Sequence, residues 1–186
     1  MMKRRVLILT SLLLTLAIVS TSSIAQDDFK PQTVFLIRHA ERENEPRQDP
    51  PLKLEGVARS QELARLLAAA GIKTIITSQF TRTRQTAEPL ASKLGLSATA
   101  ISLKLNPSNP RQIAEESTRE VVNKILERAG ENALVVGHSN SISDVIKMLG
   151  GNVVPSIDEQ KYNDLFVVTV YAKGKAKVAH LKYGAE

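Results

Sequence analysis

Short strand-like runs and helical patterns alternate along most of the chain. Runs of strand length occur at residues 33–37, 74–77 and 133–136. Continuous apolar runs of this length are typical of strands that are covered on both faces of a sheet. Apolar residues at helical spacing predict helices over residues 56–70, 81–94, 113–126 and 141–149. This alternation favours a mostly parallel sheet between helices.

The end of the chain has a different pattern. Residues 165–171 and 176–181 are strand-like runs joined across Lys173, Gly174 and Lys175, which predicts an antiparallel hairpin. The expected fold class is therefore α/β, a three-layer α/β/α sandwich with an antiparallel C-terminal edge hairpin. We also expect a short strand over residues 98–101 and proline-bearing loops over residues 41–51 and 106–110.

The first 25 residues do not fit the alternating pattern. Lys3, Arg4 and Arg5 precede an apolar run over residues 6–19, and small residues end the segment at Ala25. This order is typical of a secretory signal peptide, and the run is shorter than the roughly 20 residues of a membrane span. We expect a signal peptide at residues 1–25 and one domain at residues 26–186, secreted and periplasmic, with no stable membrane insertion. An uncleaved anchor is the alternative.

Composition removes several classes of protein. The chain has 25 Lys and Arg against 19 Asp and Glu, but three of these cations belong to the leader. No basic cluster is interleaved with its seven aromatic residues, so we expect no nucleic-acid partner. The absence of Cys excludes disulfides, thiolate metal sites and a lipoprotein anchor. Oligomeric state is not predicted.

Two histidines stand at equivalent positions. Arg38 and His39 end the run at residues 33–37, and His138 ends the run at residues 133–136. Ligands of such sheets bind beyond the carboxyl ends of the strands, where both imidazoles would meet. Arg82 is expected in the first turn of a helix, next to backbone N–H groups that favour an anion. A phosphoryl group fits this set best, because guanidinium groups bind its oxygens bidentately.

Four segments in this order resemble the histidine phosphatase superfamily, also called phosphoglycerate-mutase-like. They are RHAE at residues 38–41, LKLEG at 52–56, SQFTRTRQT at 78–86 and VVGHS at 135–139. The resemblance implies that His39 is the nucleophile and becomes phosphorylated, that Arg38 and Arg82 hold the phosphoryl oxygens, and that His138 completes the pocket. It implies a metal-independent phosphatase without a cofactor, acting on a small phosphorylated substrate or a phosphopeptide.

The sequence departs from the family pattern at several positions. Ala40 and Ser139 stand where Gly is common, and Lys53 stands where Ser or Thr would cap the next helix. The proton donor is the larger difference, because no Asp or Glu lies between residues 88 and 115. The remaining candidate acids lie in one loop: Glu41, Glu43, Glu45 and Asp49. We take Glu41 as the first candidate; a substrate with a good leaving group would need no acid.

Other functions stay open. Ser139 lies in a segment similar to the nucleophile elbow of a serine hydrolase, with Asp158 or Asp164 and then His180 later in the chain. The same phosphate pocket would also serve a non-catalytic phospholigand-binding module or a phosphoglycerate-mutase-type phosphotransferase.

Overall fold

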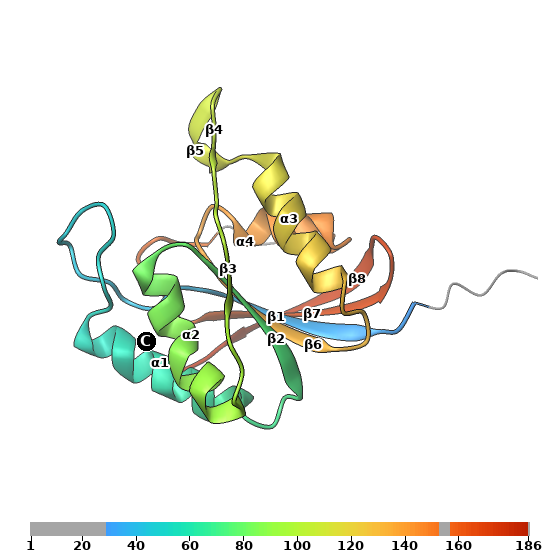
Figure 1. Ribbon diagram of the computed structural model, residues 1–186, viewed down its shortest axis with the longest axis horizontal. Helices are drawn as coiled ribbons and strands as arrows, with labels where there is room; N and C mark the ends of the chain where they lie inside the picture. The colour runs from blue at the N-terminus through green and yellow to red at the C-terminus, as the bar shows by residue number, and fades with distance from the viewer. Residues whose placement is uncertain (1–28, 153–156, 186) are drawn as a thin grey trace, which may run out of the picture.

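The centre of the protein is a six-stranded mixed sheet (Figure 1). The computed structural model describes residues 29–152 and 157–185. Across the sheet the strands follow the order β3-β2-β6-β1-β7-β8. Their bounds are β1 (Gln32–Arg38), β2 (Ile72–Ser78), β3 (Thr99–Ile101), β6 (Asn132–Gly137), β7 (Asp164–Ala172) and β8 (Lys175–Lys182).

The first four of these strands, β1, β2, β3 and β6, run parallel; β7 is antiparallel to its neighbour β1, and β8 is antiparallel to β7. Arg38 is level with Gly137, and Thr77 is level with Val136, so β1, β2 and β6 end at the same edge of the sheet. The predicted fold class is confirmed, with the C-terminal hairpin at the antiparallel edge.

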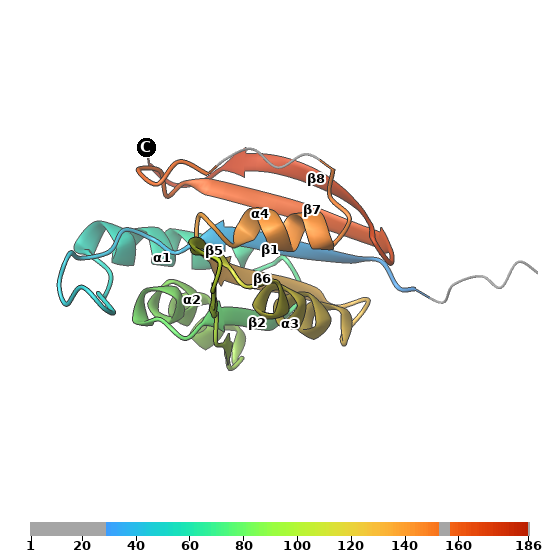
Figure 2. The ribbon, with the colours of Figure 1, turned by 90° about the horizontal axis from the view of Figure 1, so that it is seen from above.

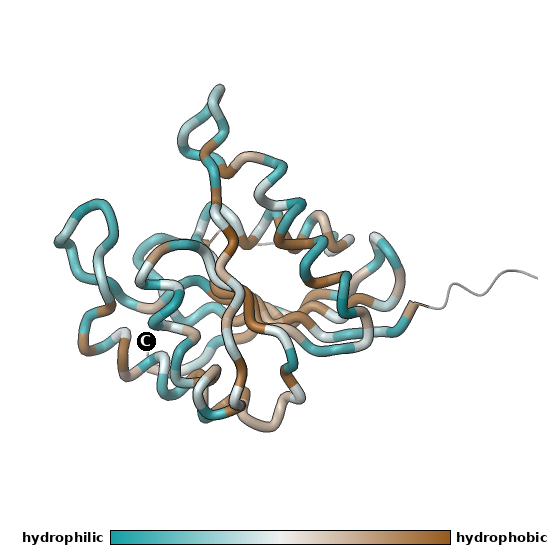
Figure 3. Tube along the Cα trace, viewed as in Figure 1, coloured by the Kyte–Doolittle hydropathy of each residue, from teal (hydrophilic) through white to brown (hydrophobic). Residues whose placement is uncertain are grey.

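Helices cover both faces of the sheet (Figure 2). Helices α1 (Leu54–Leu67) and α2 (Thr81–Leu94) pack on one face, and α3 (Glu115–Leu126) and α4 (Ile142–Met148) pack on the other. Alternate strand residues serve the two cores: Leu36 and Val135 face α3 and α4, whereas Ile37 and Val136 face α1 and α2. The central strands are accordingly mostly hydrophobic, while the loop that follows β1 is hydrophilic (Figure 3).

The prediction of a loop at residues 106–110 is wrong in part. It forms a second, two-stranded sheet from β4 (Leu105–Asn106) and β5 (Asn109–Ile113), which projects from the body in Figure 1. The Asn106 side chain accepts a hydrogen bond from the Ser108 backbone, which closes the turn. Ile113, expected in a helix, therefore ends a strand, and α3 begins two residues later.

The remaining boundaries differ by a few residues. Helix α1 begins at Leu54 and ends at Leu67, and Lys53 supplies no side-chain cap, as expected. Helix α2 ends before Gly95, whose left-handed backbone turns the chain. The predicted signal peptide lies outside the described residues. Within residues 29–152 and 157–185, no helix is long and apolar enough to cross a membrane.

Candidate active site

The two strand-end histidines meet at the carboxyl edge of the sheet. His39 follows β1, and its backbone N–H donates to the Gly137 carbonyl at the end of β6, at 3.0 Å. The rings of His39 and His138 lie edge to face with centroids 5.3 Å apart. The structure thus brings together the pair that the strand ends predicted.

His39 is a buried, neutral imidazole. Its Nδ1 lies 2.8 Å from the Ala40 carbonyl oxygen, which can only accept, so Nδ1 carries the hydrogen. The lone pair is therefore on Nε2. Burial, opposed by the Ala40 hydrogen bond and reinforced by the charges of Arg38, Arg82 and Arg42, lowers the pKa of His39 to about 3. Burial contributes more to this shift than the cationic neighbours do.

His138 is fixed from behind by β2. The Ser78 hydroxyl lies 2.9 Å from Nε2 of His138 and also 2.9 Å from the Thr83 hydroxyl. This contact leaves Nδ1 as the ring nitrogen available to a ligand. Burial first, and then the charges of the site, hold the pKa of His138 well below its usual range. Two neutral imidazoles therefore face the site at neutral pH.

Arg38 is held by the loop between α4 and β7. One of its terminal nitrogens donates to the carbonyl oxygens of Asp158, Glu159 and Lys161, the shortest contact being 2.6 Å to Glu159. Its guanidinium also stacks on the Tyr162 ring, 4.2 Å from the centroid. The Nε–H of Arg38 is buried and has no partner among the described residues.

Arg82 approaches from the first turn of α2, as the sequence predicted. It lies over the Phe80 ring at 4.2 Å, and its nearest carboxylate is Asp49, with an N–O distance of 3.9 Å. Its Nε–H is likewise buried without a partner in the described part of the chain. Buried donors are costly when unpaired, so the two arginines offer unfilled positions to an acceptor such as a phosphoryl oxygen.

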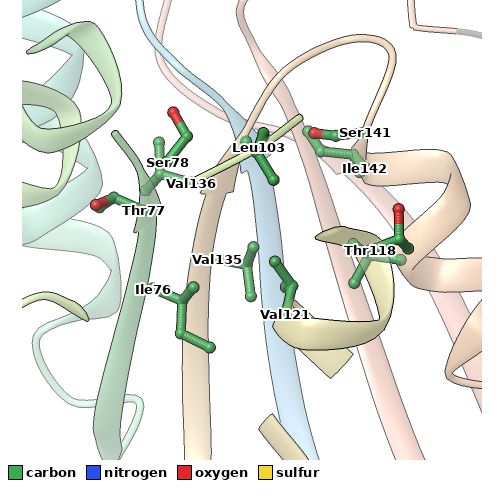
Figure 4. Close-up of a pocket in the computed structure, with 12 residues that line it drawn as sticks. Ile76, Thr77, Ser78, Leu103, Thr118, Val121, Val135, Val136, Ser141 and Ile142 are labelled. Atoms are coloured by element: carbon green, nitrogen blue, oxygen red, sulfur yellow. The ribbon is translucent and has the colours of Figure 1, made fainter. Parts of the chain in front are cut away.

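These groups line a cavity of about 310 Å³. Arg38, Arg42 and Arg82 give it positive charge, and both histidines reach it. Behind it, between β2, β6 and α3, lies an apolar cavity of about 20 Å³, with Ser78 and Ser141 at one end (Figure 4). That space holds about one water molecule. An anion must therefore occupy the larger cavity.

The acids predicted as proton donors are placed elsewhere. The Glu41 carboxylate forms an ion pair with Arg59 at 2.7 Å, which links the loop after β1 to α1. Asp49 accepts hydrogen bonds from the Thr81 backbone and hydroxyl, at 2.8 and 2.6 Å, and caps α2. Glu43 and Glu45 are exposed. None of these four lines the cavity that holds His39.

The residues of the serine-hydrolase alternative are split between two places. Asp164 binds His180 across β7 and β8, whereas Ser139 lies on the cavity with His39. Three strand spacings separate the end of β6 from β8 in the sheet order, or roughly 14 Å. Ser139 therefore has no access to His180, and the geometry does not assemble this triad.

Three residues around the site were not predicted individually. Arg42 adds a third cation to the cavity, Glu159 contributes a carboxylate to it, and Tyr162 stacks on Arg38. Glu159 and Tyr162 belong to a loop without periodicity. Among the described residues, no group of three or more His, Cys, Asp or Glu side chains is arranged to hold a metal ion.

Residues 34–104 match the model of the histidine phosphatase superfamily (branch 1). This part of the chain is similar to the histidine phosphatase superfamily. The matched range contains three of the four segments that carry the resemblance, and with them Arg38, His39 and Arg82. His138 lies beyond it and is placed by the geometry. None of the curated proteins matches the chain in sequence.

Several solved structures share the fold of this chain. The protein histidine phosphatase SixA, complexed with tungstate, superposes with a TM-score of 0.62 at 20% identity, covering 81% of this chain and 96% of its own. Phosphoglycerate mutase from Bacillus anthracis str. Sterne superposes with a TM-score of 0.65 at 17% identity, covering 83% of this chain and 94% of its own. A mycobacterial glucosyl-3-phosphoglycerate phosphatase superposes with a TM-score of 0.63 at 13% identity, covering 84% of this chain and 100% of its own. At these identities the likeness establishes the fold, and the activity has to be argued from the site.

Proposed function

We propose that this protein is a metal-independent phosphatase that works through a phosphohistidine at His39. One observation carries the proposal: a neutral imidazole with its Nε2 lone pair free lies beside two arginines whose buried Nε–H groups lack partners. A neutral imidazole is a competent nucleophile, and the arginines stabilise the charge that spreads over the phosphoryl oxygens. The match to the superfamily model and the activities named for SixA and the mycobacterial phosphatase support it.

The site divides hydrolysis into two steps. Nε2 of His39 attacks phosphorus while the bond to the leaving group breaks, and water then attacks the phosphohistidine and releases phosphate. The Nδ1–H bond to the Ala40 carbonyl orients the ring through both steps. Arg38, Arg82 and His138 hold the phosphoryl oxygens between them.

The substrate is a small phosphomonoester or a phosphohistidine peptide. The cavity accepts a phosphoryl group with part of its leaving group, and no nucleic acid is required. We further propose that residues 1–25 are removed and that the mature domain is periplasmic. N-terminal sequencing of the protein recovered from periplasm and cytoplasm tests this.

Phosphate release tests the activity. The purified protein is assayed with EDTA on p-nitrophenyl phosphate and on a phosphohistidine peptide, in wild type, His39→Ala and Ser139→Ala forms. We expect turnover by wild type and Ser139→Ala, and a loss of at least about 1,000-fold in His39→Ala, because the nucleophile is gone. Quenched protein should carry an acid-labile phosphate on His39.

Three results would contradict the proposal. Tight phosphate binding without turnover on either substrate would identify a binding module. Transfer of the phosphoryl group to an added alcohol in preference to water would identify a phosphotransferase. Esterase activity that disappears in Ser139→Ala would restore the serine-hydrolase alternative.

A further inference from the structure

A carboxylate that the sequence did not single out lies on the wall of the active-site cavity. Glu159 is the one acidic side chain among the described residues that line the cavity with His39 and His138. Glu41 and Asp49 are bound to Arg59 and Thr81. Among the acids in the described part of the chain, Glu159 is therefore the one that can reach a phosphoryl group in this cavity.

The backbone and the side chain of Glu159 have separate contacts. Its carbonyl oxygen accepts from Arg38 at 2.6 Å, whereas its carboxylate receives a long hydrogen bond of 3.5 Å from the Ser139 hydroxyl. Arg38 and Ser139 are the sequence neighbours of His39 and His138. The carboxylate thus lies beside the residue that follows His138, on the cavity that both histidines line, and replacing it leaves the backbone contact to Arg38 in place.

A second cavity, of about 460 Å³, adjoins the first at Glu159. Arg38, Arg42 and Glu159 line both. The remaining walls of the second cavity are mostly polar, formed by Glu41, Asn44, Lys53, Glu55, Gln160 and Tyr162. A substrate with its phosphoryl group at His39 and its alcohol in the second cavity would pass the Glu159 carboxylate where the two groups join. The polar walls suit a hydroxylated alcohol.

The geometry of the transfer places the leaving oxygen on the same side. His39 lies at the floor of the cavity with 3% of its surface exposed, whereas Glu159 is exposed at its rim. In an in-line displacement the leaving oxygen points away from the attacking nitrogen. It therefore points toward the opening, where the carboxylate stands.

We infer that Glu159 is the proton donor that allows this protein to hydrolyse phosphomonoesters of unactivated, hydroxylated alcohols, an inference that rests on the phosphohistidine route proposed above. As the bond from phosphorus to the alcohol oxygen breaks and the bond to Nε2 of His39 forms, the carboxyl proton of Glu159 moves to that oxygen. Water then attacks phosphorus, its proton returns to the Glu159 carboxylate, and the phosphorus–nitrogen bond breaks to release phosphate.

The leaving group decides how much this proton matters. An alkoxide is a poor leaving group, and a positioned general acid typically contributes about 100-fold to 10,000-fold to such a step. The p-nitrophenolate ion leaves without a proton. Loss of the acid should therefore slow the two substrates by very different factors.

Glu159→Gln is compared with wild type and with Glu120→Gln, which makes the same change at an exposed residue of α3 that lines neither cavity. The rate of the first turnover is measured with glycerol phosphate, phenyl phosphate and p-nitrophenyl phosphate. We expect Glu159→Gln to slow glycerol phosphate by about 100-fold and p-nitrophenyl phosphate by less than about 3-fold, with phenyl phosphate between them. Glu120→Gln should match wild type.

The pH profile provides a second readout. With glycerol phosphate the pH profile of the first turnover should differ between wild type and Glu159→Gln, whereas with p-nitrophenyl phosphate the two proteins should share one profile. Equal slowing of all three substrates, or unchanged glycerol phosphate turnover, would overturn the inference while leaving the His39 route intact. Absence of phosphate on His39 in the wild type would overturn the proposed function itself.

Discussion

Two clusters of histidine and charged residues lie near the same end of the sheet and differ in how their polar groups are satisfied. At the β7–β8 edge, the Asp164 carboxylate accepts from both His180 and Lys182, and the His180 ring stacks on Phe166 with centroids 4.6 Å apart. Each charged group there has a partner of opposite charge. This edge cluster resembles an ordinary stabilising network.

The active-site cluster is built the opposite way. His39 and His138 have no carboxylate partner among their described contacts, and Arg38 and Arg82 keep buried Nε–H groups unpaired. An unsatisfied buried donor costs about 1–3 kcal/mol. Histidine and charge near a strand end are therefore weak evidence of function. A concentration of unfilled buried donors is strong evidence, because a bound anion would recover the free energy that the unpaired donors cost.

The largest expected contrast comes from removing one cation from each cluster. Arg82→Met should lower kcat/KM on p-nitrophenyl phosphate by about 100-fold or more, because a donor to the transition-state oxygens is lost. Lys182→Met should keep kcat/KM within about 3-fold of wild type, because Lys182 contacts Asp164 and Asn163 and does not line the cavity. Steady-state kinetics on both variants measures the contrast.

A thermal-shift measurement with orthovanadate sharpens the same test. Lys182→Met should retain the stabilisation by the anion, and Arg82→Met should lose it. Similar losses of activity in the two variants would remove the distinction between the clusters.

The pH dependence of stability is the next effect in size. The unfolded chain binds a proton at His39 near pH 6.5, whereas the folded chain does so only near pH 3, so stability rises with pH between these values. Acidification from pH 6.5 to pH 5 should lower the free energy of unfolding by about 2 kcal/mol through His39 alone. Urea unfolding at several pH values should show a shallower slope for His39→Asn.

The edge cluster responds in a different pH range. Burial raises the pKa of Asp164, but hydrogen bonds from Lys182 and His180 outweigh this effect and bring the pKa below 3.8. Its stabilising charge is therefore present above pH 3.8 and is lost only as the pH falls further. Asp164→Asn should thus keep the slope between pH 6.5 and pH 4.5. If His39→Asn keeps the wild-type slope as well, His39 is not the buried neutral group described.

The parts of this molecule that the sequence predicted depend on strand periodicity. Apolar runs identify covered strands, and strands that run parallel must end at one edge, so the convergence of His39 and His138 follows from local pattern alone. Arg82 was predicted for the same reason, because the first turn of a helix after a strand lies at that edge. The family motifs then supplied a chemistry for residues that the topology had already placed.

The parts that were missed depend on tertiary closure. Glu159 and Tyr162 lie in an irregular loop, and only the contacts of that loop with Arg38 bring them to the cavity. Glu41 is two residues from His39 in sequence, yet Arg59 draws its carboxylate away. Nearness in sequence therefore suggested the wrong neighbours for the histidine, and no periodic pattern marks the right ones.

The smallest expected effect concerns Asp49, whose carboxylate lies 3.9 Å from a terminal nitrogen of Arg82. Burial raises the pKa of Asp49, but the hydrogen bonds from Thr81 and the positive charges of Arg82 and Arg84 lower it by more. Asp49 is therefore ionised at neutral pH. Because its oxygens are taken by Thr81, Asp49→Asn should cost about 1 kcal/mol of unfolding free energy as a weakened helix cap. It should lower kcat/KM by less than about 10-fold, since the Phe80 ring still holds Arg82.

Glu45→Gln is the matched control for Asp49→Asn, since Glu45 is an exposed acid of the same loop that pairs only with Arg47. In this control the unfolding free energy and kcat/KM should both equal those of the wild type. A loss in Asp49→Asn as large as that in Arg82→Met would mean that Asp49 satisfies the arginine during turnover. The active-site cluster would then be a paired network like the one at the β7–β8 edge, and its unfilled donors would no longer explain the chemistry.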